Sequence, residues 1–149
     1  MAPSIGLQRL LDLREAEETR SRQDLERAVA ELRQLEGSLM AARKRRVAAR
    51  KWVASSAETG EVIDRIAGLQ VLDNVDLLER VILQRIDEAT KEAHRKRQEV
   101  MNRRIARRQV EAIVDARMTD ARLQANRTSQ SALDDWYRTQ KLKDDRRTH

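Results

Sequence analysis

The side chains that most often carry chemistry are few in this sequence and lie far apart. There are two histidines, His94 and His149, and no cysteine among the 149 residues. His94 is followed directly by Arg95 and Lys96, and this positive charge disfavours protonation of the ring and repels a metal ion. His149 is the last residue, and chain ends are seldom ordered. The histidines therefore predict neither a metal site nor a general base.

Carboxylates occur in adjacent pairs, such as Glu17–Glu18 and Asp134–Asp135. General acid–base catalysis needs a pocket that desolvates such groups, and an exposed helix offers none. The four glycines are far apart, so they form no glycine-rich phosphate loop. We therefore expect a protein that is not an enzyme and has no cofactor, no metal and no small-molecule substrate.

The composition is typical of long helices rather than of a compact globule. Charged residues make up 38% of the chain and aromatic residues 2%, with no phenylalanine. A compact core normally uses several large aromatic side chains, whereas aliphatic residues mixed with Arg, Glu and Gln are typical of coiled coils. Complete disorder is disfavoured because the net charge of +6 is modest and the apolar residues recur periodically.

The sequence also gives expectations about location. The N-terminus has no basic segment followed by an apolar core, as a secretory signal would, and no apolar run reaches the ~18 residues of a membrane span. The absence of cysteine fits a reducing compartment. We expect a cytoplasmic protein without membrane insertion.

Helix-favouring segments and one break predict an all-α fold, a long two-helix antiparallel coiled-coil hairpin that forms one domain. Ser4 is the expected cap of the first helix, and Ser, Thr and Gly mark the break. The expected elements are helix 1 over about 4–53, a connecting region over about 54–68, helix 2 over about 69–143 and a disordered tail over 144–149.

Apolar residues at alternating steps of three and four predict a seam on each helix. On the first helix the expected seam is Leu7, Leu11, Arg14, Glu18, Ser21, Leu25, Ala28, Leu32, Leu35, Leu39, Ala42, Arg46, Ala49 and Val53. On the second helix it is Val75, Leu78, Ile82, Ile86, Ala89, Ala93, Met101, Ile105, Ala112, Ala116 and Leu123.

The break favours pairing within one chain over an intermolecular coil, although polar seam positions leave the register open. Counting outward from the break places Leu7 and Leu11 opposite 115–120. The second helix would then continue past the first by about 20 residues, or roughly 30 Å.

Basic residues gather in two bands. Residues 43–56 contain six basic residues and no acidic one, and residues 93–127 contain ten basic and four acidic residues. In a hairpin the first band faces Asp73, Asp76 and Glu79, and the second faces the acidic segment that includes Glu17 and Glu18, which favours antiparallel pairing. The basic residues that we expect to be available to partners are Arg43, Lys44, Arg45, Arg50, Lys51, Arg95, Lys96, Arg97, Arg103 and Arg104.

Nucleic acid is a disfavoured partner for these bands. The chain has almost no aromatic residues on which bases could stack, and acidic stretches separate the basic ones. Basic helix faces are more often solvated or internally paired.

A segment near the C-terminus, Ser-Gln-Ser-Ala-Leu-Asp-Asp-Trp-Tyr-Arg, gives a family resemblance. Its matching residues are Gln130, Asp134, Asp135 and Arg138. With the order of a helix, a break and a longer helix, the segment resembles the Glu-Gln-Lys…Asp-Glu…Arg pattern of the FliJ/YscO family. These proteins are the central stalks of flagellar and type III secretion export machines. Ser129 and Ser131 stand where the family tends to have Glu and Lys.

The resemblance implies a stalk that couples a hexameric secretion ATPase to a membrane export gate protein, at the periphery of the inner-membrane export apparatus. Some members also bind export chaperones. The end with the termini would enter the ATPase pore through Arg9, Arg14, Asp134, Asp135, Trp136, Tyr137 and Arg138. The turn end would face the gate through Trp52, Glu58, Glu61 and Asp64.

Other interpretations remain open from the sequence. Trp136 also suits local packing on Leu133, and Trp52 suits packing near the turn. The whole chain also suits a generic coiled-coil scaffold or chaperone-like adaptor of another assembly, or, less well, a basic nucleic-acid-binding protein.

Overall fold

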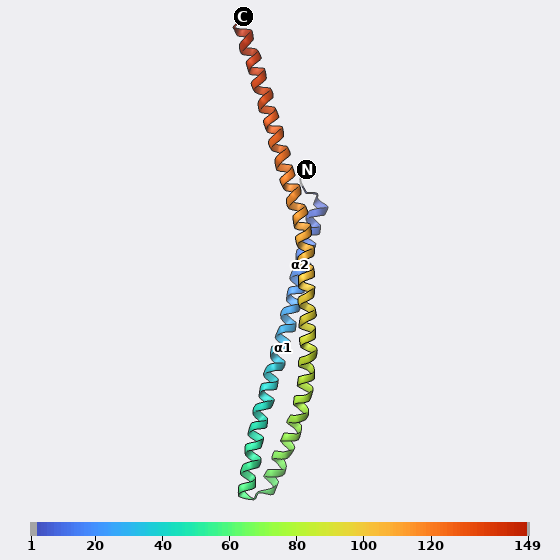
Figure 1. Cartoon of the computed structure of the whole chain (residues 1–149), viewed down its shortest axis with the longest axis vertical. Helices are drawn as coiled ribbons and strands as arrows, with labels where there is room; N and C mark the ends of the chain where they lie inside the picture. The colour runs from blue at the N-terminus through green and yellow to red at the C-terminus, as the bar shows by residue number, and fades with distance from the viewer. Residues whose placement is uncertain (1–2, 149) are drawn as a thin grey trace. The chain divides into compact units, whose positions relative to one another are not determined.

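The computed structural model describes residues 3–148 and contains two long helices, α1 (Ile5–Thr59) and α2 (Val62–Arg147) (Figure 1). The two helices pack against each other in antiparallel fashion, as the ion pairs of Arg43 with Glu79 and of Arg103 with Glu17 require. The expected all-α helical hairpin is therefore confirmed. No helix in the described part of the chain is long and apolar enough to cross a membrane.

The start of α1 is fixed by Ser4, as the sequence predicts. The Ser4 Oγ accepts a hydrogen bond from the backbone N–H of Leu7 at 3.1 Å, and its carbonyl accepts one from Gln8 at 3.0 Å. The hydroxyl thus satisfies an N–H that has no partner within the helix, which is the function of an N-cap.

The turn between the helices is much shorter than the expected connecting region of 54–68. Only Gly60 and Glu61 lie between α1 and α2, and Gly60 has a φ of 73°, the left-handed conformation that ends many helices. The expectation of a long connection was wrong because the hydroxyls of Ser56 and Thr59 bond to carbonyls three or four residues earlier. Such bonds let these residues remain helical.

The C-terminal boundary also differs from the expectation. α2 continues to Arg147 rather than ending near residue 143, so residues 144–147 are helical and not part of a disordered tail. This last stretch is strongly charged and has no glycine or proline, so nothing in it terminates a helix. The expectation of disorder at His149 lies outside the described residues.

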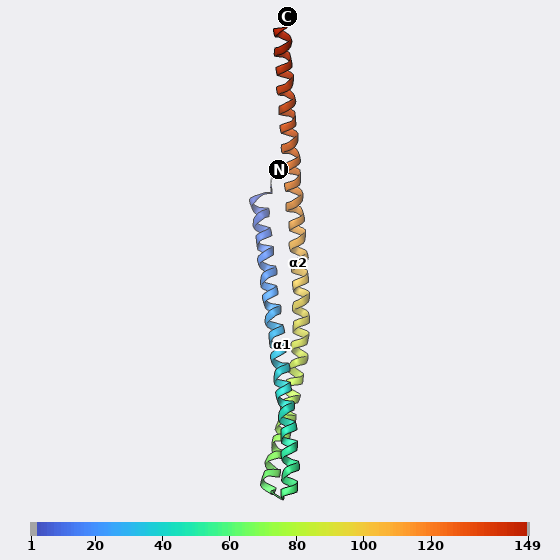
Figure 2. The same ribbon diagram turned by 90° about the vertical axis from the view of Figure 1, so that its left-hand side faces the viewer.

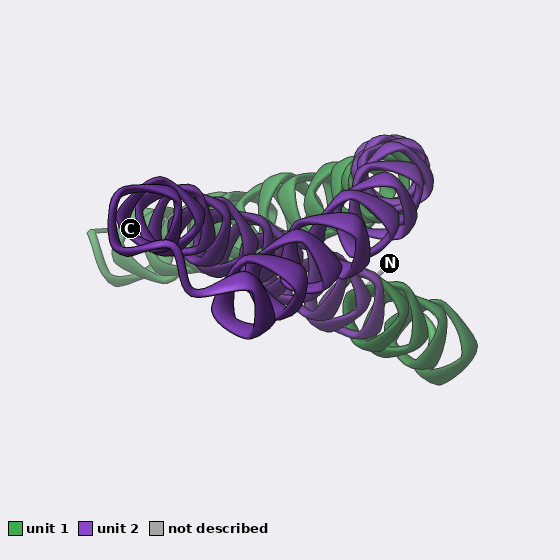
Figure 3. Ribbon diagram, turned by 90° about the horizontal axis from the view of Figure 1, so that it is seen from below, with its two compact units in different colours: residues 1–18, 103–149 green, residues 19–102 purple. Residues whose placement is uncertain are grey.

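The hairpin divides into two units, which Figure 3 distinguishes by colour. Unit 2 comprises residues 19–102 and holds the turn. Its core cluster consists of Ala42, Val75 and Ile82, against which Leu39, Val71 and Ile86 pack. Apart from Val71, which precedes the expected seam of the second helix, these positions follow the seams expected in this unit.

Gly68 marks a close approach of the two helices in unit 2. It is buried, and a Cβ atom added to it would lie 2.6 Å from Cγ2 of Val53 on α1. The sequence assigns this glycine to a connecting region, but the structure uses its lack of a side chain for packing inside α2.

Unit 1 comprises residues 1–18 and 103–149. Its core cluster is Leu11 with Val110 and Val114, and Leu7 and Leu10 pack against it. Leu11 therefore lies opposite 110–114, just before the expected level of 115–120. The outward count from the break overshot the level at which Leu11 packs with Val110 and Val114.

The seam of α1 is confirmed along its length, including the polar positions Glu18 and Ser21, which are buried. On α2 the expected seam is correct at five positions between Val75 and Ala93, but Leu78 is 42% exposed and Glu79 takes its place. The later expectations are wrong, because these residues are exposed: Met101, Ile105, Ala112, Ala116 and Leu123.

The physical reason is that the true seam of α2 passes through charged residues. After Ala93 it continues by steps of three and four through residues none of which is exposed: Lys96, Val100, Arg104, Arg107, Val110 and Val114. Counting apolar residues alone skips the charged positions and moves the pattern onto the outer face of the helix.

Candidate functional site

The C-terminal segment of unit 1 is a helix without a facing partner. Residues 122–148 are all exposed, and this part of α2 continues past the first residues of α1 (Figures 1 and 2). An isolated helix buries no apolar surface and is only marginally stable in water. We therefore regard this segment as the first candidate contact surface, and we call it the C-terminal extension.

The C-terminal extension carries a small aromatic patch, formed by Leu133, Trp136 and Tyr137. The rings of Trp136 and Tyr137 meet edge to face, with centroids 5.1 Å apart and an interplanar angle of 73°. The two side chains remain 58% and 64% exposed, and Leu133 lies one helical turn earlier. Local packing of the tryptophan thus leaves most of the patch available for contact.

The polar residues beside the patch are also exposed. Gln130 donates a hydrogen bond to Asp134 at 3.5 Å, whereas Asp135 and Arg138 lie at the surface of the same helix. These residues and the aromatic patch are thus all exposed on the same stretch of helix, distributed around it.

Arg9 and Arg14 do not join this surface. Leu11, which lies between Arg9 and Arg14 on α1, packs against Val114 of α2. Trp136 lies 22 residues after Val114, which is about 33 Å farther along α2. Arg14 is half-buried and forms an ion pair with Glu17 at 3.1 Å, so its charge is already engaged within unit 1. The structure thus separates the expected ATPase-binding residues into two groups.

A buried carboxylate organises the interface of the two helices in unit 1. Glu18 is 4% exposed and forms ion pairs with Arg104, at 3.4 Å, and with Arg107. Arg107 also pairs with Glu111, and the hydrogen bond that Arg107 donates to Glu18 raises the pKa of Arg107 above its ordinary value. A buried charge is tolerated here because several partners surround it.

The second basic band is largely paired within the chain. Arg103 binds Glu17 at 3.1 Å and Arg104 binds Glu18, as the expected opposition of charges predicts. Arg95 pairs with Glu92, and Lys96 lies 3.4 Å from Glu99. Of the five residues expected to face partners from this band, only Arg97 has no ion pair in the described part of the chain.

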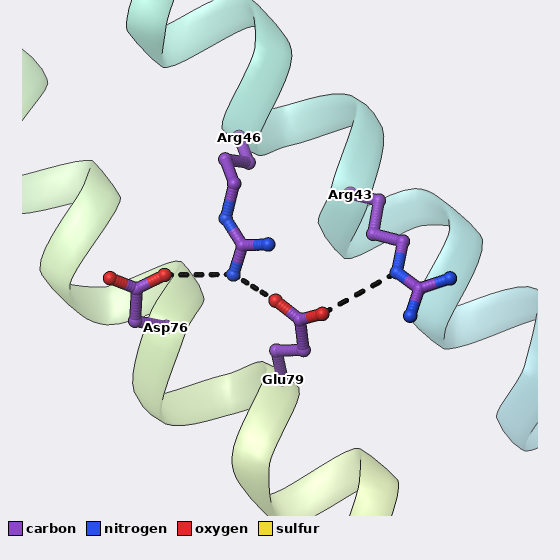
Figure 4. A network of polar contacts seen from close by, with 4 residues as sticks. All are labelled: Arg43, Arg46, Asp76 and Glu79. Carbon is purple, nitrogen blue, oxygen red and sulfur yellow. Dashed lines mark hydrogen bonds and ion pairs between the residues drawn. The ribbon is translucent and has the colours of Figure 1, made fainter.

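The first basic band is paired on one side only. Figure 4 shows Arg46 between Asp76, at 2.7 Å, and Glu79, which also binds Arg43 at 3.4 Å. These contacts confirm the expected opposition of this band to acidic residues of α2. The other four basic residues of this band have no ion pair within residues 3–148: Lys44, Arg45, Arg50 and Lys51.

The turn end of unit 2 presents apolar side chains that the sequence interpretation missed. Val62, Ile63 and Ile66 on the first turns of α2 are more than half exposed, and Trp52, which was already named from the sequence, is 43% exposed. The three aliphatic residues fall in the expected connecting region, although their spacing after Gly60 already fits one helical face.

The expected acidic residues surround this turn. Glu58 is exposed, and Glu61 lies next to Asp64 at the start of α2. A hydrogen bond with Asp64, together with the negative charge of Asp64, raises the pKa of the Glu61 carboxyl. The turn end therefore combines negative charge with exposed aliphatic groups.

The chain is thus an all-α helical hairpin with exposed apolar side chains on both units. No group of three or more His, Asp or Glu residues in the described chain is arranged to hold a metal ion. No protein-family model, curated protein or solved structure matches the chain.

Proposed function

We propose that this chain is a non-enzymatic stalk of a type III secretion or flagellar export apparatus. It would bind a hexameric export ATPase and link it to the membrane export gate, on the cytoplasmic side of the inner membrane. The observation that carries the proposal is the aromatic patch on a helical extension that has no facing helix.

The extension suits insertion into a concave partner such as the pore of a ring-shaped hexamer. Trp136 and Tyr137 offer large, rigid contact areas, and residues of this type dominate the energy of many interfaces. Asp134, Asp135 and Arg138 on the same helix would set the orientation by pairing with charges of the pore. The polar C-terminal motif that resembles the family lies on this same extension.

A coupling protein needs a second, different surface for its second partner. The turn end offers one, with exposed aliphatic residues beside Glu58, Glu61 and Asp64. Its chemistry differs from that of the C-terminal extension, so each surface would select its own partner. We assign the turn end to the export gate protein.

The test is to add the purified chain to the hexameric export ATPase of the same organism and to measure ATP hydrolysis and hexamer formation. We expect stimulation that saturates with increasing chain. Replacing Trp136 and Tyr137 together by alanine should raise the half-maximal concentration at least ~10-fold, because each residue contributes about 1 kcal/mol or more at such an interface.

Leu142→Ala is the matched control, because Leu142 is exposed on the same extension but lies outside the aromatic patch. It should leave stimulation unchanged. An ATPase that shows neither faster hydrolysis nor more hexamer at saturating chain would overturn the proposal. Recovery of partners that include no export ATPase or gate protein would instead favour a scaffold of another assembly.

A further inference from the structure

We propose that unit 2 binds an acidic amphipathic helix from another protein, in a groove between α1 and α2 beside Trp52. The groove has a volume of about 360 Å³ and is lined by Arg45, Ala48, Ala49, Trp52 and Val71; we call it the Trp52 groove. The inference goes beyond the stalk function and does not depend on the ATPase.

The shape of the groove follows from its small residues. Ala48 and Ala49 leave space between the helices, and the indole of Trp52 forms a wall beside them. Leu78 lies seven residues after Val71, so a coiled-coil helix places the two on the same face. The apolar lining therefore continues along α2 beyond the groove itself.

The groove residues together with Leu78 form an apolar strip. Its side chains are more exposed than those of the buried seam between the helices. Trp52 is 43% exposed and Leu78 is 42% exposed, so both side chains remain open to a partner. On α1 the groove runs from Arg45 to Trp52, seven residues later, which is roughly 10 Å or two helical turns. Two packed helices that leave such a strip open provide the usual docking site for a third amphipathic helix.

Charge identifies the character of the third helix. Lys44 and Lys51 are surface neighbours of Ala48, four residues before it and three after it, and Arg45 lines the groove. None of these three has an ion pair in the described chain, whereas Arg43 and Arg46 already occupy the facing acidic groups. A partner helix with acidic flanks would supply the missing counter-charges.

The same charges argue against a second copy of the chain as the occupant. Two copies that met through their Trp52 grooves would bring Lys44, Arg45 and Lys51 of both molecules together, and like charges at an interface are unfavourable. A polyanion such as nucleic acid would satisfy the charges but would leave the apolar strip uncovered.

The test uses the full chain with Trp136→Phe, so that Trp52 is the sole tryptophan and reports on the groove. The probe is a synthetic three-heptad helix with Leu at its apolar positions and Glu at the flanking ones. The control peptide carries Lys in place of each Glu. We expect a saturable blue shift of Trp52 emission with the Glu peptide, and affinity at least tenfold weaker with the Lys peptide.

Two neighbouring leucines provide a matched pair of variants. Leu78→Gln removes an apolar group from the strip, whereas Leu77→Gln makes the same change on the outer face, where Leu77 is 61% exposed. We expect at least tenfold weaker binding for the first and less than twofold for the second. If circular dichroism shows that Leu78→Gln lowers helicity, Ala48→Gln, which fills the groove from α1, serves as the second variant, with the same expected loss.

Three results would overturn the proposal. They are equal losses for L77Q and L78Q, equal affinity for the Glu and Lys peptides, and a dimer in sedimentation that shields Trp52 without any peptide. Because no ATPase is present, these outcomes are separate from failure of the stalk function.

Discussion

Replacing Glu18 by alanine would remove the buried carboxylate that holds two arginines in unit 1. Glu18 is 4% exposed and pairs with Arg104 and Arg107 across the seam. Its loss leaves a small cavity and two positive charges without their partner. The change therefore tests whether this ion-pair network stabilises the hairpin or only accompanies it.

The expected cost is intermediate between those of buried and surface pairs. Removing one partner of a fully buried pair costs about 3–5 kcal/mol, because the other charge remains buried without compensation. Here the side chains of Arg104 and Arg107 are 44% and 22% exposed, so both can regain water. We therefore expect Glu18→Ala to lower the free energy of unfolding by about 1.5–3 kcal/mol.

Glu18→Leu separates the electrostatic role from packing. Glu18 occupies the same seam position as Leu11 and Leu25, seven residues away on each side. Leucine would fill the seam while both arginines turn toward water, so stability should equal or exceed that of the native chain. The ion pair would then contribute pairing register rather than net stability.

The assay is urea unfolding followed by far-ultraviolet circular dichroism, with amide hydrogen exchange to locate the effect in residues 5–18 and 103–114. Glu26→Ala is the control, because Glu26 is exposed and has no ion pair in the described chain. It should change stability by less than about 0.5 kcal/mol. The reasoning is refuted if Glu18→Ala matches this control, or if Glu18→Leu is as destabilising as Glu18→Ala.

Further predictions concern the turn and its neighbours. Gly60→Ala should destabilise by about 1 kcal/mol in thermal unfolding, since its φ is 73°, whereas Gly37→Ala in open helix should stabilise by a similar amount. Gly68→Ala should cost about 1–3 kcal/mol, because the added Cβ meets a stiff β-branched side chain on α1; an unchanged melting temperature would contradict this close approach. The pKa of Glu61 in an NMR titration should be raised above that of an ordinary Glu, and Asp64→Asn should lower it. Because this carboxyl pKa is raised on folding, its contribution to stability is greatest below the unfolded pKa and is lost as the pH rises through the folded pKa.

The fold was predictable because its signals are local and repeated. The seam of α1 follows steps of three and four from Leu7 to Val53, and even its charged members, such as Arg46 and Glu18, lie where the periodicity places them. Opposed charge blocks then favour an antiparallel partner, and the pairs of Arg46 with Asp76 and Glu79 realise that pattern.

What the sequence did not predict depends on pairing rather than on periodicity. The seam of α2 near Lys96 and Arg107 is charged, and its position becomes evident only when the acidic residues of α1 are placed opposite. Likewise Gly68 looks like a helix breaker until Val53 is known to lie against it.

The two candidate surfaces also differ in how far the sequence predicts them. Trp136 and Tyr137 were identified directly, because large aromatic residues in a chain with so few of them are conspicuous. The Trp52 groove could not be identified from the sequence, because it combines small residues of α1 with Val71 of α2.

The two-residue turn has a consequence for the order in which the chain folds. Contacts close to the turn join residues near in sequence, such as Arg46 and Asp76, which are 30 residues apart, whereas Glu18 and Arg107 are 89 residues apart. Closing a short loop costs less entropy and occurs sooner than closing a long one. Unit 2 should therefore form first, with pairing then spreading from Gly60 toward the buried Glu18. In the native protein, opening would begin where pairing finishes, so among the residues paired across the hairpin the first turns of α1 should exchange their amide protons earliest.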